Sequence, residues 1–172
     1  MQVLPNTAFL DKYNDSNYKN HPVIGVTHLQ AKQYCKWLGL RLPNKFEWEV
    51  AARETKEQLW PWGDDPPSPV DAHMFLDDDL SGTVPVRMPK ENQQPLYHMV
   101  GNVWEWVEWI DLECSGLSCR LLLHQKSNSI RNHFIAMGGS FDSNIGMINE
   151  TYDLNSEVAE PDIGFRCAKF PN

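Results

Sequence analysis

The chain has 172 residues, a formal net charge of −8 and 41% hydrophobic residues. This length and composition fit one globular domain with a core of its own and exclude a largely disordered chain. The negative charge, without a cluster of Lys and Arg, argues against nucleic acid as a partner, and no apolar run is long enough to span a membrane.

A helix is expected to begin after Thr27. Residues 23–26 before it are apolar and form either a short strand or an ordered connector. Thr27 and Gln30 have the spacing of a capping box, and Gly39 is a residue that ends a helix in the left-handed conformation. The apolar residues of this helix recur at spacings of three and four, which predicts one shared face: Ala31, Tyr34, Cys35 and Leu38.

A second helix is predicted to begin after Asn44, which is a favoured N-cap residue with Glu47 three positions later. Phe46 and Val50 are expected on its apolar face. The stripe is widened by three further residues: Trp48, Ala51 and Ala52.

From residue 60 onward the sequence favours short strands and long loops, because twelve Pro and ten Gly residues punctuate the whole chain. Strands are predicted at 84–86, 103–109, 134–141 and 163–169. Residues 111–132 show no period and are predicted to be an irregular insert. Most tryptophans are expected in the core, with their N–H groups bonded to carbonyls: Trp37, Trp48, Trp62, Trp104, Trp106 and Trp109.

An ordered series of motifs runs through most of the chain, and the most specific is Gly101-Asn102-Val103-Trp104-Glu105-Trp106. The others lie, in order, at 21–27, 31, 34–37, 41–43, 47–49, 51–53, 61–63, 85–86, 96–97, 99–100, 138–140 and 163–167. Together they resemble the formylglycine-generating enzyme, or sulfatase-modifying factor, family. The resemblance implies an α+β fold of the C-type-lectin-like kind, with two helices packed on small antiparallel sheets and much irregular loop. It also implies a single domain over residues 1–172, in which 1–20 are the remnant of a shortened N-terminal segment.

The resemblance implies that catalytic members bind copper through two cysteines that follow the Gly-Gly-Ser strand. Here residues 141–152 contain no cysteine. Carboxylates, hydroxyls and amides do not replace thiolates around Cu(I), which is a soft ion. We therefore expect no copper and no formylglycine-generating oxidase activity.

Calcium is the cofactor that the resemblance does imply, because family members bind it at the Gly-Asn-Val-Trp-Glu loop. The ligands would be the carbonyls of Gly101 and Val103 and the side chain of Glu105, which are hard oxygen donors. His98 stands where the family has Asn or Asp, and imidazole is a poor calcium ligand. A second site would use Asp71, the Ala72 carbonyl and one or more of Asp77, Asp78 and Asp79; the alternative there is an acidic solvated loop.

Four cysteines leave three possible pairings of two disulfides. Cys114 and Cys119 either close a small surface loop or remain free thiols, and the sharper alternative is a relocated dithiol for metal or redox chemistry. The resemblance implies a disulfide between Cys35 and Cys167, against two buried free cysteines. Disulfides would favour an extracytoplasmic compartment.

The function that follows is a non-catalytic scaffold that binds a protein or a small ligand through its C-terminal loops. The residues expected to contact that ligand are polar and lie where relatives do chemistry: Asp142, Ser143, Asn144, Asn149 and Tyr152. Arg41, Arg53 and Arg166, with Glu47 and Glu49, are expected to form structural ion pairs. The alternative function is a metal- or thiol-dependent oxidoreductase.

Overall fold

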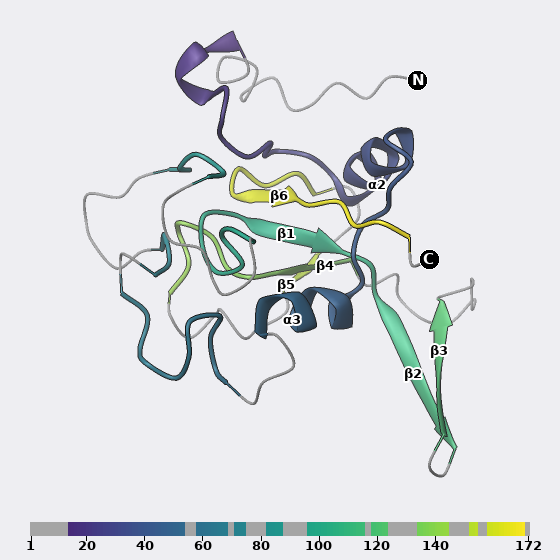
Figure 1. The fold of residues 1–172 in the computed structure, drawn as a ribbon. Helices are drawn as coiled ribbons and strands as arrows, with labels where there is room; N and C mark the ends of the chain where they lie inside the picture. Colours follow the sequence, from purple (N-terminus) through teal and green to yellow (C-terminus); the bar gives the residue numbers. More distant parts are fainter. Residues whose placement is uncertain are drawn as a thin grey trace.

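The structure is a computed structural model, and it describes residues 14–53, 58–68, 71–74, 82–87, 96–115, 118–123, 134–144, 152–154 and 158–170. It shows an α+β fold in which two helices flank a small mixed sheet (Figure 1). The described elements in chain order are the 3-10 helix η2 (Ser16–Tyr18), α2 (His28–Trp37), α3 (Lys45–Arg53), β1 (Trp104–Val107), β2 (Ile110–Ser115), β3 (Ser118–Leu123), β4 (Phe134–Met137), β5 (Tyr152–Leu154) and β6 (Ile163–Phe165).

The central sheet has the strand order β5-β4-β1-β6. Strand β1 runs antiparallel to β4 and parallel to β6, with Glu105 opposite Met137 on one side and opposite Gly164 on the other. The prediction of purely antiparallel sheets is therefore wrong at β6. A parallel neighbour needs a long crossover connection, and the chain between β1 and β6 supplies one.

The two helices cover opposite faces of this sheet. Successive strand residues point to opposite faces, and Trp104 and Trp106 of β1 pack in one core cluster with Ala31 and Cys35 of α2. Val107 of β1 packs in a second cluster with residues of α3, together with Ile135 and Met137 of β4. All four residues of β1 are buried as a result, as expected for a strand with both faces covered.

The predicted start and end of α2 are confirmed. The Thr27 hydroxyl accepts from the Gln30 N–H, the Gln30 side chain accepts from the Thr27 N–H, and Gly39 has φ +73°. Ala31 and Cys35 are fully buried, but Trp37 is 77% exposed and its assignment to the core is wrong. Trp37 lies six residues after Ala31 and two after Cys35, so at about 100° per residue it falls on the opposite side of the helix.

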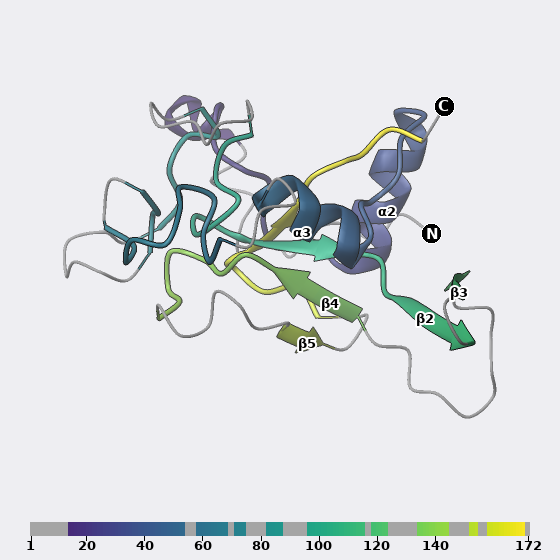
Figure 2. The same ribbon diagram turned by 60° about the horizontal axis from the view of Figure 1, so that its bottom comes forward.

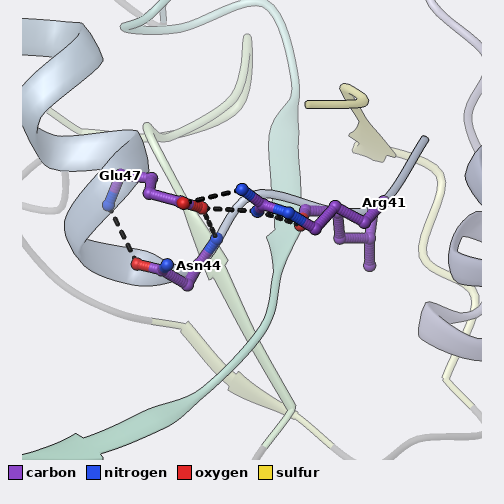
Figure 3. A network of polar contacts seen from close by, with 4 residues as sticks. Arg41, Asn44 and Glu47 are labelled. Carbon is purple, nitrogen blue, oxygen red and sulfur yellow. Dashed lines mark hydrogen bonds and ion pairs between the residues drawn. The ribbon is translucent and has the colours of Figure 1, made fainter. Parts of the chain in front are cut away.

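Helix α3 begins as predicted, with Asn44 and Glu47 bonding reciprocally (Figure 3). Glu47 also accepts two hydrogen bonds from Arg41, at 2.6 and 2.7 Å, which confirms one expected ion pair. The buried face is narrower than the predicted stripe: Trp48 and Ala52 are buried, whereas Val50 is 53% exposed.

Two strand pairings differ from the predictions, and the first lies in the segment 111–132 that was predicted to be an irregular insert. Strands β2 and β3 form an antiparallel hairpin there, with Glu113 opposite Arg120. The hairpin projects away from the central sheet in both views (Figures 1 and 2). Strand β5 extends the central sheet beyond β4 and was not predicted either.

Residues 84–86 are not a strand, contrary to prediction. The amide and carbonyl of Val84 are both taken by the Asn102 side chain, at 3.0 and 3.2 Å. Pro85 has no N–H to donate to a ladder. Residues 23–26 are an ordered connector rather than a strand.

A disulfide joins Cys35 of α2 to Cys167, just beyond β6, across 132 residues of chain. It confirms the pairing that the resemblance implied. The same end of the chain is held by an antiparallel bridge between Arg41 and Ala168.

Candidate functional site

The turn after β4 is a rigid polar structure. Gly138 and Gly139 have φ of +98° and +74°, a region that only glycine adopts freely. Ser140 is fully buried, and its hydroxyl donates to Asp162 at 2.7 Å. Since that proton is used, the Ser143 hydroxyl donates in the 3.1 Å contact between the two serines, while its oxygen accepts from the Ser140 N–H at 2.9 Å.

This turn divides the predicted ligand-binding residues into two groups. Asp142 and Asn144 are exposed, whereas Ser143 is 2% exposed and bonded to Ser140. Ser143 thus holds the turn rather than facing solvent. The backbone of Tyr152 lies on β5, and Asn149 is outside the described residues.

Asn102 connects four segments of the site, and sequence reasoning missed it. It is 2% exposed and has φ +65°. Besides the two bonds to Val84, its N–H donates to the His73 carbonyl at 2.7 Å and its carbonyl accepts from Phe141 at 3.0 Å. The only signal in the sequence was Asn after Gly, a pair that favours left-handed backbone.

Glu105 and Arg166 form a buried ion pair beneath this loop. Arg166 donates from Nε to Oε2 at 2.5 Å and from Nη2 to Oε1 at 2.6 Å, and Trp48 Nε1 donates to Oε2 at 2.7 Å. Burial by itself lowers the pKa of Arg166, but the attraction of Glu105 and its hydrogen bonds outweigh burial and raise that pKa above its ordinary value. The expectation that Arg166 forms a structural ion pair is confirmed, with Glu105 as the partner.

The geometry of Glu105 does not support calcium at this loop. Both carboxylate oxygens accept from Arg166, so a cation would have to share them with a guanidinium of the same charge sign. The Gly101 carbonyl already accepts from the Val103 N–H at 2.9 Å. His98 donates from Nε2 to the Pro85 carbonyl at 3.1 Å. Calcium at Gly101, Val103 and Glu105 stays a prediction that these contacts disfavour.

The second predicted calcium site is described only in part. Asp71 accepts from the Ser68 hydroxyl at 2.6 Å, and the Ala72 N–H donates to the Ser68 carbonyl, so both residues belong to one turn. Asp77, Asp78 and Asp79 lie outside the described residues. Within the described ranges, no three His, Cys, Asp or Glu side chains gather as a metal site would require.

A groove of about 470 Å³ opens beside the Glu105–Arg166 pair. We call it the Arg166 groove; its lining includes Val23, Tyr34, Arg87, Leu96, Phe165 and Arg166. His98 and Asn102 also line it, and they are the two non-glycine residues with positive φ in the described parts of the chain. Burial lowers the pKa of the His98 imidazole below its ordinary value, although its bond to the Pro85 carbonyl opposes the shift.

The predicted cysteine pair 114/119 lies on the projecting hairpin. Cys114 and Cys119 are directly opposite in the antiparallel register of β2 and β3. A disulfide between them stays a prediction. No helix in the described ranges has the length and apolar character of a membrane span.

Comparison with known proteins gives a family match over nearly the whole chain. Residues 6–170 match the family described as "Sulfatase-modifying factor enzyme 1-like domain". A formylglycine-generating enzyme of Thermomonospora curvata is 31% identical over 88% of this chain, and the chain spans 56% of its length. The serine/threonine-protein kinase pkn1 of Chlamydia caviae is 32% identical over 90% of this chain, which spans 25% of that relative.

Of two further matches, one is a sequence match over about half of this chain and the other is a structural match. The inactive Cα-formylglycine-generating enzyme 2 of Bos taurus is 40% identical over 49% of this chain and 32% of its own length. The solved structure of Treponema denticola variable protein 1 superposes with a TM-score of 0.72 at 21% identity, covering 88% of this chain and 72% of that one. The second match shows a shared fold alone.

Proposed function

The chain belongs to the sulfatase-modifying factor family, and on that premise we propose that it is a binding domain without formylglycine-generating activity. The observation that carries the proposal is the turn after β4. Where the resemblance implies copper-binding thiolates, residues 141–152 contain no cysteine. The turn instead buries two serine hydroxyls and exposes Asp142 and Asn144.

A rigid turn that holds polar side chains outward suits recognition. The hydrogen bonds among Ser140, Ser143 and Asp162 fix the backbone, so a ligand would meet Asp142 and Asn144 already positioned. Preorganisation of this kind lowers the entropy lost on binding. The family contains both active and inactive relatives by name, so membership alone does not assign oxidase activity.

The catalytic half of the proposal is tested with a cysteine-containing sulfatase peptide and Cu(I), with aldehyde product measured by mass spectrometry. The Thermomonospora curvata enzyme, assayed alongside, is the positive control. We expect no aldehyde from this chain. Aldehyde formation above the peptide-only background would overturn the proposal.

The binding half is tested with peptides selected on the purified chain from a random display library. We expect that some of these peptides bind Asp142→Ala and Asn144→Ala variants about tenfold more weakly, as truncation of a central contact does. Asp65→Ala, which removes an exposed carboxylate from a different loop, is the matched control. If every selected peptide bound all three variants equally, the turn would not be the binding surface.

A thiol-dependent oxidoreductase is the second candidate, and one observation favours it: Cys114 lies opposite Cys119 in the hairpin register. Cross-strand neighbours are close enough to exchange between dithiol and disulfide. Stoichiometric Cu(I) binding under reducing conditions, lost in a Cys114→Ser/Cys119→Ser variant, would favour this candidate over the scaffold.

The Cys35–Cys167 disulfide is consistent with an oxidising, extracytoplasmic compartment. The chain spans about half or less of the length of the relatives named above.

A further inference from the structure

The Arg166 groove combines a guanidinium at its base with apolar walls. Arg166 lines the groove, and 26% of its side chain is exposed. Within the described parts of the chain, its contacts are made by Nε and Nη2, to Glu105 and to the carbonyls of Tyr97 and His98. Nη1 is thus the guanidinium nitrogen left for a molecule in the groove.

The charge around the groove is locally positive in an acidic protein. Arg87 is exposed at the rim. Among the described residues of the lining, Glu105 is the one carboxylate, and both its oxygens are engaged by Arg166. Arg87 and Arg166 together outweigh Glu105, so the groove attracts anions although the chain as a whole carries −8.

The walls of the groove are apolar and aromatic. Tyr34 is 50% exposed, Val23 is 43% exposed, and the rings of Tyr34 and Phe165 meet edge to face with centroids 5.6 Å apart. Leu96 completes the apolar lining. Surfaces of this kind bury a flat hydrocarbon group, while a small number of polar groups fix its orientation.

Two side-chain-bearing residues beside the groove have left-handed backbone. His98 has φ +52° and Asn102 has φ +65°, conformations that cost side-chain-bearing residues free energy and that gather at functional sites. Gly101 between them is held against the His73 carbonyl, since a Cβ there would lie 2.4 Å from that oxygen.

We propose that the Arg166 groove binds a carboxylate attached to an apolar or aromatic body, with the carboxylate on Arg166 Nη1 and Arg87 and the body against Tyr34 and Phe165. One free Nη1 and one rim arginine suit the single charge of a carboxylate. This site is separate from the turn that bears Asp142, so it stands whether or not that turn binds anything.

The test uses 3-phenylpropionate as the probe and 3-phenylpropanamide as its uncharged analogue. Each is titrated into the ¹⁵N-labelled full chain. We expect the acid to shift the amide signals of Tyr97, His98 and Phe165 and the side-chain signals of Arg166. The amide should bind about tenfold more weakly, because it loses the charge-assisted hydrogen bonds. Shifts confined to other parts of the chain, or equal affinities for acid and amide, would overturn the proposal.

Variants that leave the buried ion pair intact provide the second arm. Arg87→Gln should lower the affinity for 3-phenylpropionate about fivefold without changing the affinity for 3-phenylpropanamide. Lys36→Gln removes the same charge from an exposed position on α2 outside the groove lining, and it should leave both affinities within about twofold. If Lys36→Gln lowered the affinity for 3-phenylpropionate as much as Arg87→Gln does, the electrostatic attraction would not be specific to the groove. That result would overturn the proposed site.

Discussion

At the scale of single residues, two Arg–Glu ion pairs lie in different environments. Arg166 and Glu105 pair bidentately in the interior, where 26% and 7% of their side chains are exposed. Arg41 and Glu47 also pair bidentately, through Nη1 and Nη2 of the guanidinium, near the surface, with 24% and 37% of their side chains exposed. The acceptor carboxylate is the main difference, since Glu105 also accepts from Trp48 and has almost no access to water.

Removing the arginine of each pair should therefore have unequal effects. Arg166→Met leaves a buried carboxylate unpaired, and we expect it to lower the free energy of unfolding by about 3–5 kcal/mol. Arg41→Met leaves a carboxylate that water can reach, and the expected loss is about 1 kcal/mol. Urea denaturation of the two variants measures both values; similar losses would mean that Glu105 is hydrated in solution.

Residue-scale contacts also separate what the sequence predicts from what it does not. Thr27 with Gln30, and Asn44 with Glu47, were predictable because each pair bonds across three positions of one chain segment. The partner of Glu105 was not, because Arg166 lies 61 residues away. A carboxylate in a loop for which the resemblance implies calcium gives no local sign that a guanidinium bonds to its oxygens.

At the scale of elements, the loop between residues 98 and 103 depends on glycine for two separable reasons. Gly101 and Gly39 have nearly the same φ, +74° and +73°. A Cβ at Gly39 would meet nothing within 4 Å, whereas one at Gly101 would lie 2.4 Å from the His73 carbonyl oxygen. The two positions thus share a conformational cost, and Gly101 adds a steric one.

Alanine at each position should resolve the two costs. Gly39→Ala has only the cost of placing an alanine in left-handed backbone, which should lower the free energy of unfolding by about 1–2 kcal/mol. This corresponds to a fall in Tm of roughly 2–8 °C. Gly101→Ala should lower Tm well beyond that range, because the loop must move away from His73. Thermal unfolding followed by circular dichroism compares them, and equal Tm values would show that the loop relaxes freely.

The strands show where element prediction fails. The positions of β1, β4 and β6 were predicted from short runs rich in apolar residues, but the direction of β6 was not, because the tertiary fold determines which strands pair. The hairpin of β2 and β3 was missed although Ile110–Ser115 alternates apolar and polar residues, because residues 121–123 of its second strand are all leucine and give no alternation. The sequence between the two strands also lacks the Asn-Gly or Asp-Gly pair that is the strongest local signal of a β-hairpin.

At the scale of the whole molecule, the Cys35–Cys167 bridge connects α2 to the segment just beyond the last strand, β6. It closes a loop of 132 residues, and a cross-link over such a distance restricts the unfolded chain strongly. By the chain-entropy relation, its contribution to the free energy of unfolding is about 5 kcal/mol.

We expect a Cys35→Ala/Cys167→Ala variant to unfold at a markedly lower urea concentration than the oxidised wild type. Reductant should shift the wild type by at least this amount and the variant by less than half as much, since a bridge across the short β2–β3 turn would close a much smaller loop. A large effect of reductant on the variant would mean that Cys114 and Cys119 matter more for stability than Cys35 and Cys167.

The placement of α2 and α3 on opposite sides of β1 has a wider consequence. Among the described strands, β1 at the centre of the sheet is shielded on both faces in this way and leaves no open surface on which another molecule could stack. Recognition is then left to the connecting segments and to the outward sides of the helices, where changes in sequence leave the interior undisturbed. The same framework can therefore acquire new binding partners by substitutions in its loops alone.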